Sequence, residues 1–278
     1  MPDFTSTLTN AIARQYDLFQ QSLDTIAKDR AFLNYGYTDR GAPGANSVPI
    51  ETRQERLCLE VFKAADVHPD HTVVDVGFGS GAQDVLFART FAFERLIGFN
   101  ISERQVRAAT DRAAREGLSD RLTFRLGEAE SLPGLDAASV DRLVAVECAF
   151  YFDRPRFYRR AAEVLKPGGL LVLADIQLSE RLRWLTRRED LRRVGTVAAN
   201  RREWDRHFSE RSIRHINRET RPGVQMSVWH ILRTIPSARF SAAERLEWLK
   251  MAYYSQFVAL GLAAELVNYD LLVLEKKL

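Results

Sequence analysis

Three alternating glycines form the most informative cluster in the sequence. They lie in the stretch Gly77-Phe78-Gly79-Ser80-Gly81, which follows the short apolar run 72–76. Glycines at the end of a strand let the backbone turn tightly and approach a nucleotide-like ligand closely. A site for NAD would also need an acidic residue about 20 positions further on, and this sequence has Asn100 there. The cluster therefore indicates a nucleotide-like ligand and counts against NAD.

A second stretch contains side chains that could take part in a reaction. It is Glu147-Cys148-Ala149-Phe150-Tyr151, which follows the apolar run 143–146. Ligands of open α/β sheets bind at the carboxyl ends of the strands, so this stretch is expected to line a site. The Glu147 carboxylate could take a proton from a ligand, or it could only cap the next helix or pair with an arginine. Tyr151 and His207 are further catalytic candidates, although a surface or packing role is the simpler interpretation of His207.

Strands and helices are expected to alternate through the middle of the chain. Apolar runs predict strands over residues 72–76, 95–100, 122–126, 140–147 and 170–176. Helices are expected over residues 50–65, 84–90, 102–115 and 155–165. Ser102 is a plausible N-cap, and Lys166-Pro167-Gly168-Gly169 is a stop signal. This alternation predicts a parallel sheet with helices on both faces.

The flanks are less regular. Residues 1–33 are expected to form one or two helices, followed by a loop over 34–49. Residues 179–206 and 224–234 are predicted to be helical, with a possible strand at 212–217. A helix over 241–260 begins with the capping box of Ser241 and Glu244 and is expected to end at Gly261. Residues 269–275 are predicted to form a last, antiparallel strand.

Composition narrows the class of protein. The 278 residues suit one α/β core with additions, and no apolar run approaches the roughly 18 residues needed to cross a bilayer. The first ten residues lack the features of a secretory signal. Cys58 and Cys148 have no metal-ligand spacing, which favours a reducing cytoplasm and no metal site. The net charge of +3 is too small to argue for a nucleic-acid partner.

Four pieces of sequence carry a resemblance to a known family. They are residues 74–81, 98–106, 127–133 and 164–169, in this order and spacing. With them the chain resembles the class I S-adenosylmethionine-dependent methyltransferases of small molecules. It looks most like the branch with sterol and tocopherol C-methyltransferases, rifamycin and phenolphthiotriol O-methyltransferases and prenyl diphosphate C-methyltransferases. The resemblance implies an α/β fold with a doubly wound, Rossmann-like, seven-stranded sheet in one domain. We expect an N-terminal helical lid over 1–49, a cofactor-binding core over 50–178, a helical cap over 179–236, and a C-terminal helix and strand over 237–278.

The resemblance also implies a site for S-adenosyl-L-methionine. Asp75 and the glycine turn should face the methionine part of the cofactor. Asn100 takes the place of an acid that binds both ribose hydroxyls, and Glu128 with Ala129 takes the place of the adenine site. In the segment Tyr35-Gly36-Tyr37, an aromatic ring could close over the sulfonium, or the tyrosines could only pack a helix onto the core. The full set expected at the cofactor is Tyr37, Asp75, Gly77, Gly79, Gly81, Asn100, Ile101, Gln105, Glu128, Ala129 and Glu147.

The expected activity is transfer of a methyl group to an oxygen or carbon of a small, largely apolar, natural-product-type acceptor. One alternative is C-methylation of a prenyl diphosphate, with Glu147 stabilising a carbocation and arginines of the 181–221 segment holding the anion. A second alternative is a non-catalytic, cofactor-binding partner protein. Nucleic-acid methylation is discounted because the stretch at 147–150 lacks the motif of base methylators. The expected partners are a small-molecule acceptor and a possible second copy of the chain.

Overall fold

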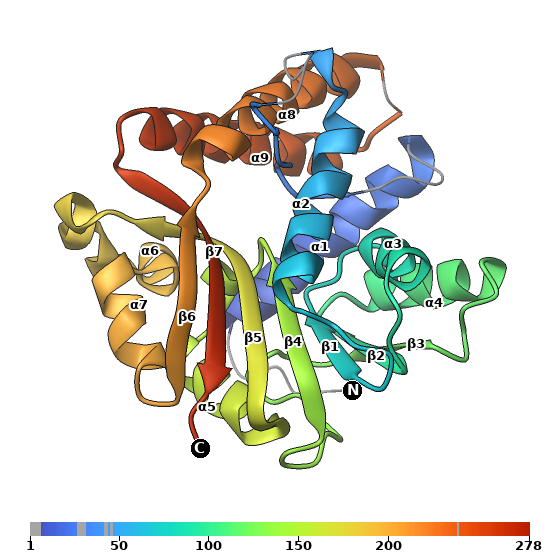
Figure 1. Ribbon diagram of the computed structural model, residues 1–278. Coiled ribbons are helices and arrows are strands. Elements are labelled where there is room, and N and C mark those ends of the chain that lie inside the picture. The colour runs from blue at the N-terminus through green and yellow to red at the C-terminus, as the bar shows by residue number, and fades with distance from the viewer. Residues whose placement is uncertain (1–6, 27–31, 42–43, 45–46, 238) are drawn as a thin grey trace.

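A seven-stranded sheet forms the centre of the protein (Figure 1). The structure is a computed structural model that describes residues 7–26, 32–41, 44, 47–237 and 239–278. The strand order is β3-β2-β1-β4-β5-β7-β6. The strands are β1 (Thr72–Val76), β2 (Arg95–Asn100), β3 (Leu122–Leu126), β4 (Val140–Val146), β5 (Leu165–Leu178), β6 (Phe208–His215) and β7 (Val267–Lys276). The prediction of a seven-stranded, Rossmann-like sheet is confirmed.

The parallel strands of the sheet are those that helices cover on both faces. β1 to β5 pair in parallel, and all five residues of β1 are buried. Continuous apolar runs of this kind are typical of parallel strands with helices on both faces. β7 inserts antiparallel between β5 and β6, as predicted for the last strand.

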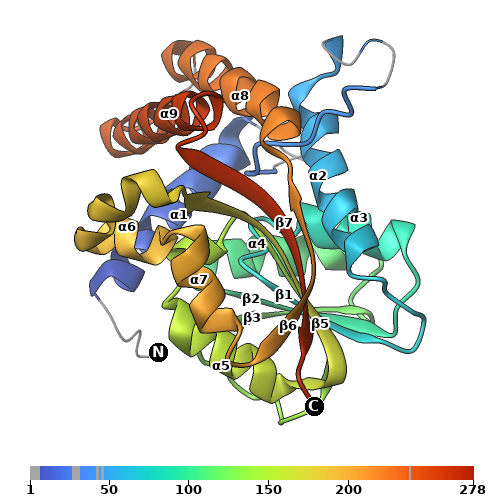
Figure 2. The ribbon, with the colours of Figure 1, turned by 60° about the vertical axis from the view of Figure 1, so that its left-hand side comes forward.

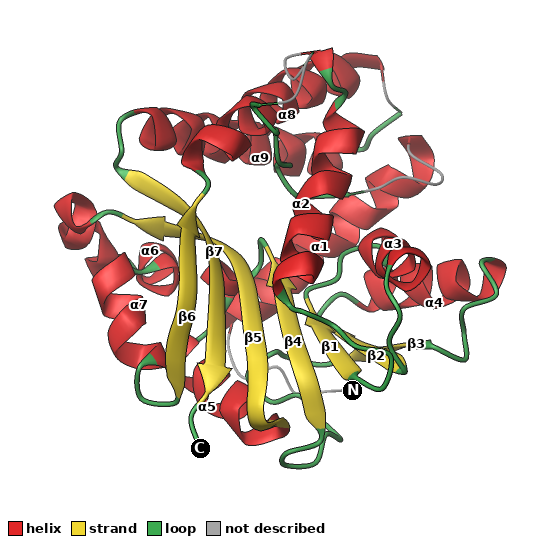
Figure 3. Ribbon diagram, viewed as in Figure 1, coloured by secondary structure: helices red, strands yellow, loops and turns green. Residues whose placement is uncertain are grey.

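Helices cover the two faces of the sheet, as Figure 3 shows. On one face lie α2 (Ile50–Ala64), α3 (Ala82–Thr90) and α4 (Glu103–Arg115), with Leu57, Phe62 and Phe87 fully buried. On the other face α5 (Arg154–Val164) and α7 (Val197–Trp204) bury Phe157 and Trp204. The predicted N-cap of α4 is confirmed, because Ser102 accepts a hydrogen bond from the Gln105 N–H.

The remaining helices gather beyond the carboxyl ends of the parallel strands (Figure 2). They are α1 (Thr7–Ile26), η2 (Ala149–Tyr151), η3 (Glu180–Arg187), α6 (Glu189–Val194), α8 (Asn217–Ser237) and α9 (Ala242–Ala263). α8 and α9 lie side by side at the top of the view in Figure 1. This layer stands where an open α/β sheet binds its ligands.

Three boundaries differ from those expected. The possible strand at 212–217 within the expected cap overlaps β6, which begins four residues earlier and forms an edge of the sheet. β5 begins five residues early, because Leu165 already pairs with Val140 before a bulge. The predicted end of the last helix at Gly261 was wrong, since α9 continues to Ala263. A Cβ on Gly261 would lie 2.5 Å from Val267 Cγ2, so this glycine serves close packing of α9 on β7.

The expected N-terminal helices fall only partly within the described residues. α1 accounts for residues 7–26 of the predicted 1–33 segment, and residues 1–6 and 27–31 lie outside the description. The same holds for positions 42–43 and 45–46 of the predicted loop.

A buried ion pair joins one helix of the sheet to the layer above it. Arg154, at the start of α5, donates from Nη1 to Asp175 Oδ2 on β5 at 2.7 Å, and both side chains are almost fully buried. The same guanidinium donates to the carbonyls of Arg193 and Val194 in α6. Its hydrogen bonds therefore connect α5, β5 and α6.

Replacing Arg154 with Met should destabilise the protein by about 3–5 kcal/mol, because Asp175 would be left buried and unpaired. Arg159 on the same helix is the matched control, since it is well exposed and lies 3.9 Å from Glu163. Arg159→Met should cost less than about 1 kcal/mol. Urea denaturation measures both free energies of unfolding, and equal losses would contradict this account of the pair.

Candidate active site

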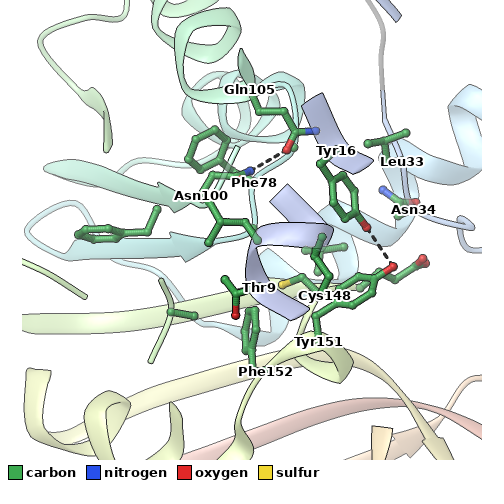
Figure 4. A pocket seen from close by; sticks show the side chains of 18 of the residues that line it. Thr9, Tyr16, Leu33, Asn34, Phe78, Asn100, Gln105, Cys148, Tyr151 and Phe152 are labelled. Atoms are coloured by element: carbon green, nitrogen blue, oxygen red, sulfur yellow. Dashed lines mark hydrogen bonds between the residues drawn. The ribbon is translucent and has the colours of Figure 1, made fainter. Parts of the chain in front are cut away.

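A cavity opens where the strand order reverses between β1 and β4. β2 and β3 lie on one side of this point and β5 on the other, an arrangement that leaves a crevice at the carboxyl ends. Together with the solvent open to it, the cavity spans about 910 Å³ of empty space, and Figure 4 shows it from close by. It lies between the ends of β1 to β4, the helix α1 and the segment 32–34. Its lining includes Tyr16, Asn34, Gly77, Phe78, Gly79, Gln83, Asn100, Ile101, Gln105, Ala129, Glu130, Glu147, Cys148 and Tyr151.

At two positions of the turn after β1, glycine is needed for different structural reasons. A Cβ on Gly77 would lie 2.7 Å from Cys148 Sγ, so this glycine lets the ends of β1 and β4 approach each other. Gly79 has a φ of +62°, and a Cβ there would have no protein atom within 4 Å. Gly79 therefore faces the open cavity, where a missing side chain leaves room for a ligand.

A short hydrogen-bond chain ends β2. The Asn100 side chain accepts from the Ser102 N–H at 3.0 Å and donates to Gln105 Oε1 at 2.9 Å. This leaves Gln105 Nε2 buried without a partner among the described residues. Asn100 thus orients Gln105, whose free N–H groups can reach a hydroxyl oxygen of a ligand.

Two buried carboxyls lie behind the glycine turn. Asp75 Oδ2 accepts a hydrogen bond from Gln83 Nε2 at 2.6 Å, and Gln83 lines the cavity. Burial raises the pKa of Asp75 to about 7. Burial and the adjacent Asp75 charge raise the pKa of Asp84 well above its usual value. Because two adjacent carboxylates resist ionising together, the pair holds a proton near neutral pH.

Unpaired buried polar atoms allow a test of whether S-adenosylmethionine fits this cavity. Within the described part of the chain, two residues of the cavity wall have such atoms: Asn34 Oδ1 is an acceptor without a donor, and Gln105 Nε2 is a donor without an acceptor. Buried polar groups rarely stay unpaired. The cofactor has an ammonium group that donates hydrogen bonds and ribose oxygens that accept them. The residues present therefore fit it.

Glu147 ends β4 in a strained backbone conformation, with a φ of +53°. Its Oε1 accepts from the Tyr35 N–H at 2.7 Å and from the Tyr269 hydroxyl. Its Oε2 has no hydrogen-bond partner among the described residues and the side chain keeps some exposure, which is to the cavity. Burial raises the pKa of Glu147 to about 8, although the hydrogen bonds from Tyr269 and Tyr35 oppose the shift. A non-glycine residue at positive φ in a cavity wall is typical of a functional position.

A second, larger cavity adjoins the first. It holds about 1920 Å³ of open space and shares Ile12, Tyr16, Leu33, Glu147 and Tyr151 with the smaller one. The Tyr16 hydroxyl donates to the Tyr151 hydroxyl at 3.3 Å (Figure 4). Most of the wall is apolar, from Leu8, Ala11, Phe150, Ile176, Leu178, Leu191, Val194, Met251, Tyr254, Phe257, Val258 and Val267. Glu147 thus stands at the junction of the two cavities.

The structure brings most of the expected site residues to the smaller cavity. These are Gly77, Gly79, Asn100, Ile101, Gln105, Ala129, Glu147 and Tyr151. Asp75, Gly81 and Glu128 do not line it. Asp75 and Glu128 are buried behind the wall, and Gly81 is the left-handed N-cap of α3.

Tyr37 and His207 lie away from both cavities. The Tyr37 hydroxyl accepts from Arg214 at 3.3 Å, and the residue that reaches Glu147 from the same segment is Tyr35. His207 precedes β6, next to Phe208, which pairs with Lys276. Because β7 runs antiparallel to β5, the Phe208–Lys276 pair lies at the amino ends of the parallel strands. Glu147 lies at their carboxyl ends. His207 is therefore no part of the candidate active site.

The sequence alone did not predict several of the residues that line the cavity. Gln83 and Phe78 lie within or next to the glycine turn, so that motif could have indicated them. Tyr16 and Asn34 carry no such signal, because only the docking of α1 and of the 32–38 segment brings them to the cavity. Cys148 also lines it, and its thiol donates to the Val76 carbonyl at 3.0 Å. Burial raises the pKa of this thiol well above its usual value, so it stays protonated.

Two features are absent from the described residues. No three side chains of the His, Cys, Asp or Glu type come together as a metal site there. None of the described helices is long and apolar enough to cross a membrane.

Comparisons with known proteins agree with this geometry. Residues 74–173 match the family model described as a methyltransferase domain. Erythromycin 3''-O-methyltransferase of Saccharopolyspora erythraea is 36% identical over 162 residues, which are 58% of this chain and 51% of that protein. The chain thus spans about half the length of this curated relative.

Two solved structures resemble the whole chain. One is the [4+2]-cyclase SpnF, with a TM-score of 0.78 and 22% identity over 97% of this chain and 96% of that one. The other is geranyl diphosphate C-methyltransferase from Streptomyces coelicolor A3(2), with a TM-score of 0.68 and 18% identity over 99% and 100%. The latter was solved with Mg²⁺, geranyl diphosphate and S-adenosyl-L-homocysteine. The chain therefore has the fold of these two structures, and its residues 74–173 are similar to a methyltransferase domain.

The raised pKa of Glu147 makes the stability of the protein depend on pH. A carboxyl whose pKa is higher in the folded state than in the unfolded state adds stability below the unfolded pKa. This stability is lost as the pH rises through the folded value of about 8. Between about pH 5 and pH 9 the wild type should therefore lose roughly 1–3 kcal/mol relative to Glu147→Gln. Urea denaturation of both proteins across this range tests the expectation, and parallel pH dependences would contradict it.

Proposed function

We propose that this chain transfers the methyl group of S-adenosyl-L-methionine to an oxygen or carbon of a small, largely apolar, natural-product-type acceptor. The observation that carries the proposal is the junction of two cavities at Glu147. The smaller cavity offers polar groups that match the cofactor, and the larger one offers apolar walls for an acceptor. The methyltransferase domain over residues 74–173 supports the same reaction.

The chain's own residues would align the acceptor and receive its proton. When bound, S-adenosylmethionine would supply a methyl group on a positively charged sulfur and leave as S-adenosylhomocysteine. Glu147 Oε2 would take the proton of the acceptor hydroxyl as that oxygen gains the methyl group. Tyr35 and Tyr269 hold the other oxygen of this carboxylate in place. Holding two reactants in such an arrangement and excluding water can lower the barrier by several kcal/mol.

C-methylation of a prenyl diphosphate is the second candidate, with Glu147 stabilising a developing positive charge. It needs cations for the diphosphate. Arg14 and Lys250 line the larger cavity, but Lys250 already pairs with Glu247 at 2.7 Å. The apolar wall therefore favours an acceptor without a diphosphate.

A cofactor-binding protein without methyltransferase activity is the remaining alternative. SpnF has the same fold and is described as a [4+2]-cyclase, so the fold does not decide the reaction. Conversion of S-adenosylmethionine to S-adenosylhomocysteine in the presence of an acceptor separates the two possibilities.

Three predictions from the sequence stay part of this proposal. The chain works in the cytoplasm, in keeping with two buried cysteines that form no disulfide. It forms homodimers. The N-terminal segment 1–49, which includes α1 and the 32–38 segment, closes over the site as a lid.

Binding of S-adenosylhomocysteine to wild type should be abolished by Gly79→Arg, because the new side chain would fill the cavity. Gly117→Arg is the matched control. Gly117 has a φ of +66° and, like Gly79, no atom within 4 Å of a Cβ, but it lies at the end of α4 outside the cavity. Both variants carry the same backbone strain, so calorimetric titration isolates the effect of the cavity. Equal affinities in the two variants, or no binding to folded wild type, would refute the proposed cofactor site.

If Glu147 accepts the proton, kcat/KM should increase with pH up to about 8 in the wild type. Glu147→Gln should lose this dependence and at least about 100-fold in rate, while keeping its affinity for S-adenosylhomocysteine. The acceptor is a compound that the wild type methylates, chosen from a panel of phenols and polyketides. Initial rates with it measure kcat/KM as a function of pH. A Gln variant with the wild-type profile would exclude Glu147 as the base.

A further inference from the structure

Helices α8 and α9 expose an unusual amount of apolar surface. Of the ten large apolar side chains that are exposed among the described residues, eight lie on these two helices: Trp229, Leu232, Leu246, Leu249, Tyr253, Tyr254, Phe257 and Leu260. From Met251 to the end of α9 the sequence contains no charged residue. Large apolar side chains exposed together on two neighbouring helices mark an interaction site.

Five of these side chains form a narrow stripe along α9. They are Leu246, Leu249, Tyr253, Phe257 and Leu260, and each is between 48% and 71% exposed. At 100° per residue they fall within an arc of about 80° and extend about 21 Å along the helix. A stripe this narrow is typical of a helix that packs against another helix.

The spacing of the stripe is symmetric about its central residue. Leu246 and Leu249 precede Tyr253 by seven and four positions, and Phe257 and Leu260 follow it by four and seven. When two copies of α9 pack antiparallel across a two-fold axis at Tyr253, Leu246 of each copy meets Leu260 of the other, and Leu249 meets Phe257. This is the self-complementarity that a two-fold interface requires.

A groove between α8 and α9 adjoins the stripe. Its lining includes Trp229, Leu232, Leu249 and Tyr253, and it is open to solvent. Two parallel ridges with an apolar groove between them can receive side chains of a second, inverted helix pair. A lipid surface would gain nothing from the symmetric spacing, so the occupant that fits best is another copy of the same surface.

We propose that the protein forms a two-fold dimer in which α8 and α9 of the two copies make an antiparallel four-helix bundle centred on Tyr253. This inference names the interface for the homodimer of the proposed function, but it does not depend on methyl transfer. Phe257 belongs both to the stripe and to the wall of the larger cavity. Pairing would therefore close one side of the candidate acceptor cavity.

A cysteine at the axis tests the geometry directly. Inward-facing Cα atoms of two packed helices would lie about 4–5 Å apart, within the range of a disulfide. Tyr253→Cys should therefore form a covalent dimer under mild oxidation. Trp184→Cys is the matched control, since Trp184 is 63% exposed on η3 and lies outside this surface. The native cysteines are buried in both variants. Equal cross-linking of the two variants on a non-reducing gel would overturn the proposal.

A charge exchange tests the register. Leu246→Glu and Leu260→Lys should each weaken dimerisation by about 100-fold, as expected for charges placed in an apolar seam. The double variant should recover most of this loss, because the introduced carboxylate of each copy would meet the introduced ammonium group of the other. Within one chain the two positions are about 21 Å apart, so the introduced charges cannot pair there.

Sedimentation velocity over a range of protein concentrations measures these dissociation constants without cofactor or acceptor, so the outcome is independent of the proposed reaction. Failure of the double variant to recover, where both single variants have weakened the dimer, would overturn the antiparallel register. A wild type that stays monomeric, or that sediments only with phosphatidylglycerol vesicles, would overturn the dimer.

Discussion

The candidate active site depends on how one carboxylate, that of Glu147, is held at the switch point of the sheet. Its Oε1 takes hydrogen bonds from the Tyr35 N–H and the Tyr269 hydroxyl, and its backbone N–H donates to the carbonyl of Ala174 on β5. These contacts compensate for a strained φ and for burial of a group that would otherwise ionise in water. Because one oxygen is fixed and the other is free, the carboxylate is oriented toward the space between the two cavities.

Segments distant in sequence are needed to build this arrangement. The 32–38 segment reaches Glu147 only because it packs tightly on α8, where Gly223 leaves room for the Tyr35 carbonyl. The Tyr35 hydroxyl bonds Ser255 of α9 at 2.9 Å. Tyr35 therefore connects the Glu147 carboxylate to the helical layer above the sheet.

Polar contacts hold helix α1 beside the candidate active site. Asp17 accepts hydrogen bonds from the Ser102 hydroxyl at 2.6 Å and from the Arg104 N–H at 3.3 Å, so it binds the N-terminus of α4. A carboxylate at a helix N-terminus is stabilised by the unpaired N–H groups and the helix dipole. Ser22 donates to Glu244 of α9.

The sequence alone determined the sheet, the glycine turn and the position of Glu147, because these depend on local patterns. Apolar runs, a capping serine and glycines after a strand act within a few residues of each other. The same reasoning indicated Asn100 and Gln105 near the ligand but placed His207 among the catalytic candidates and Tyr37 instead of Tyr35 at the site. Only the tertiary structure decided these points. Whether His207 lies near Glu147 depends on the direction of β7, and Tyr16 and Asn34 reach the cavity through packing of α1 and α8. Such long-range contacts leave no periodic signal in the chain.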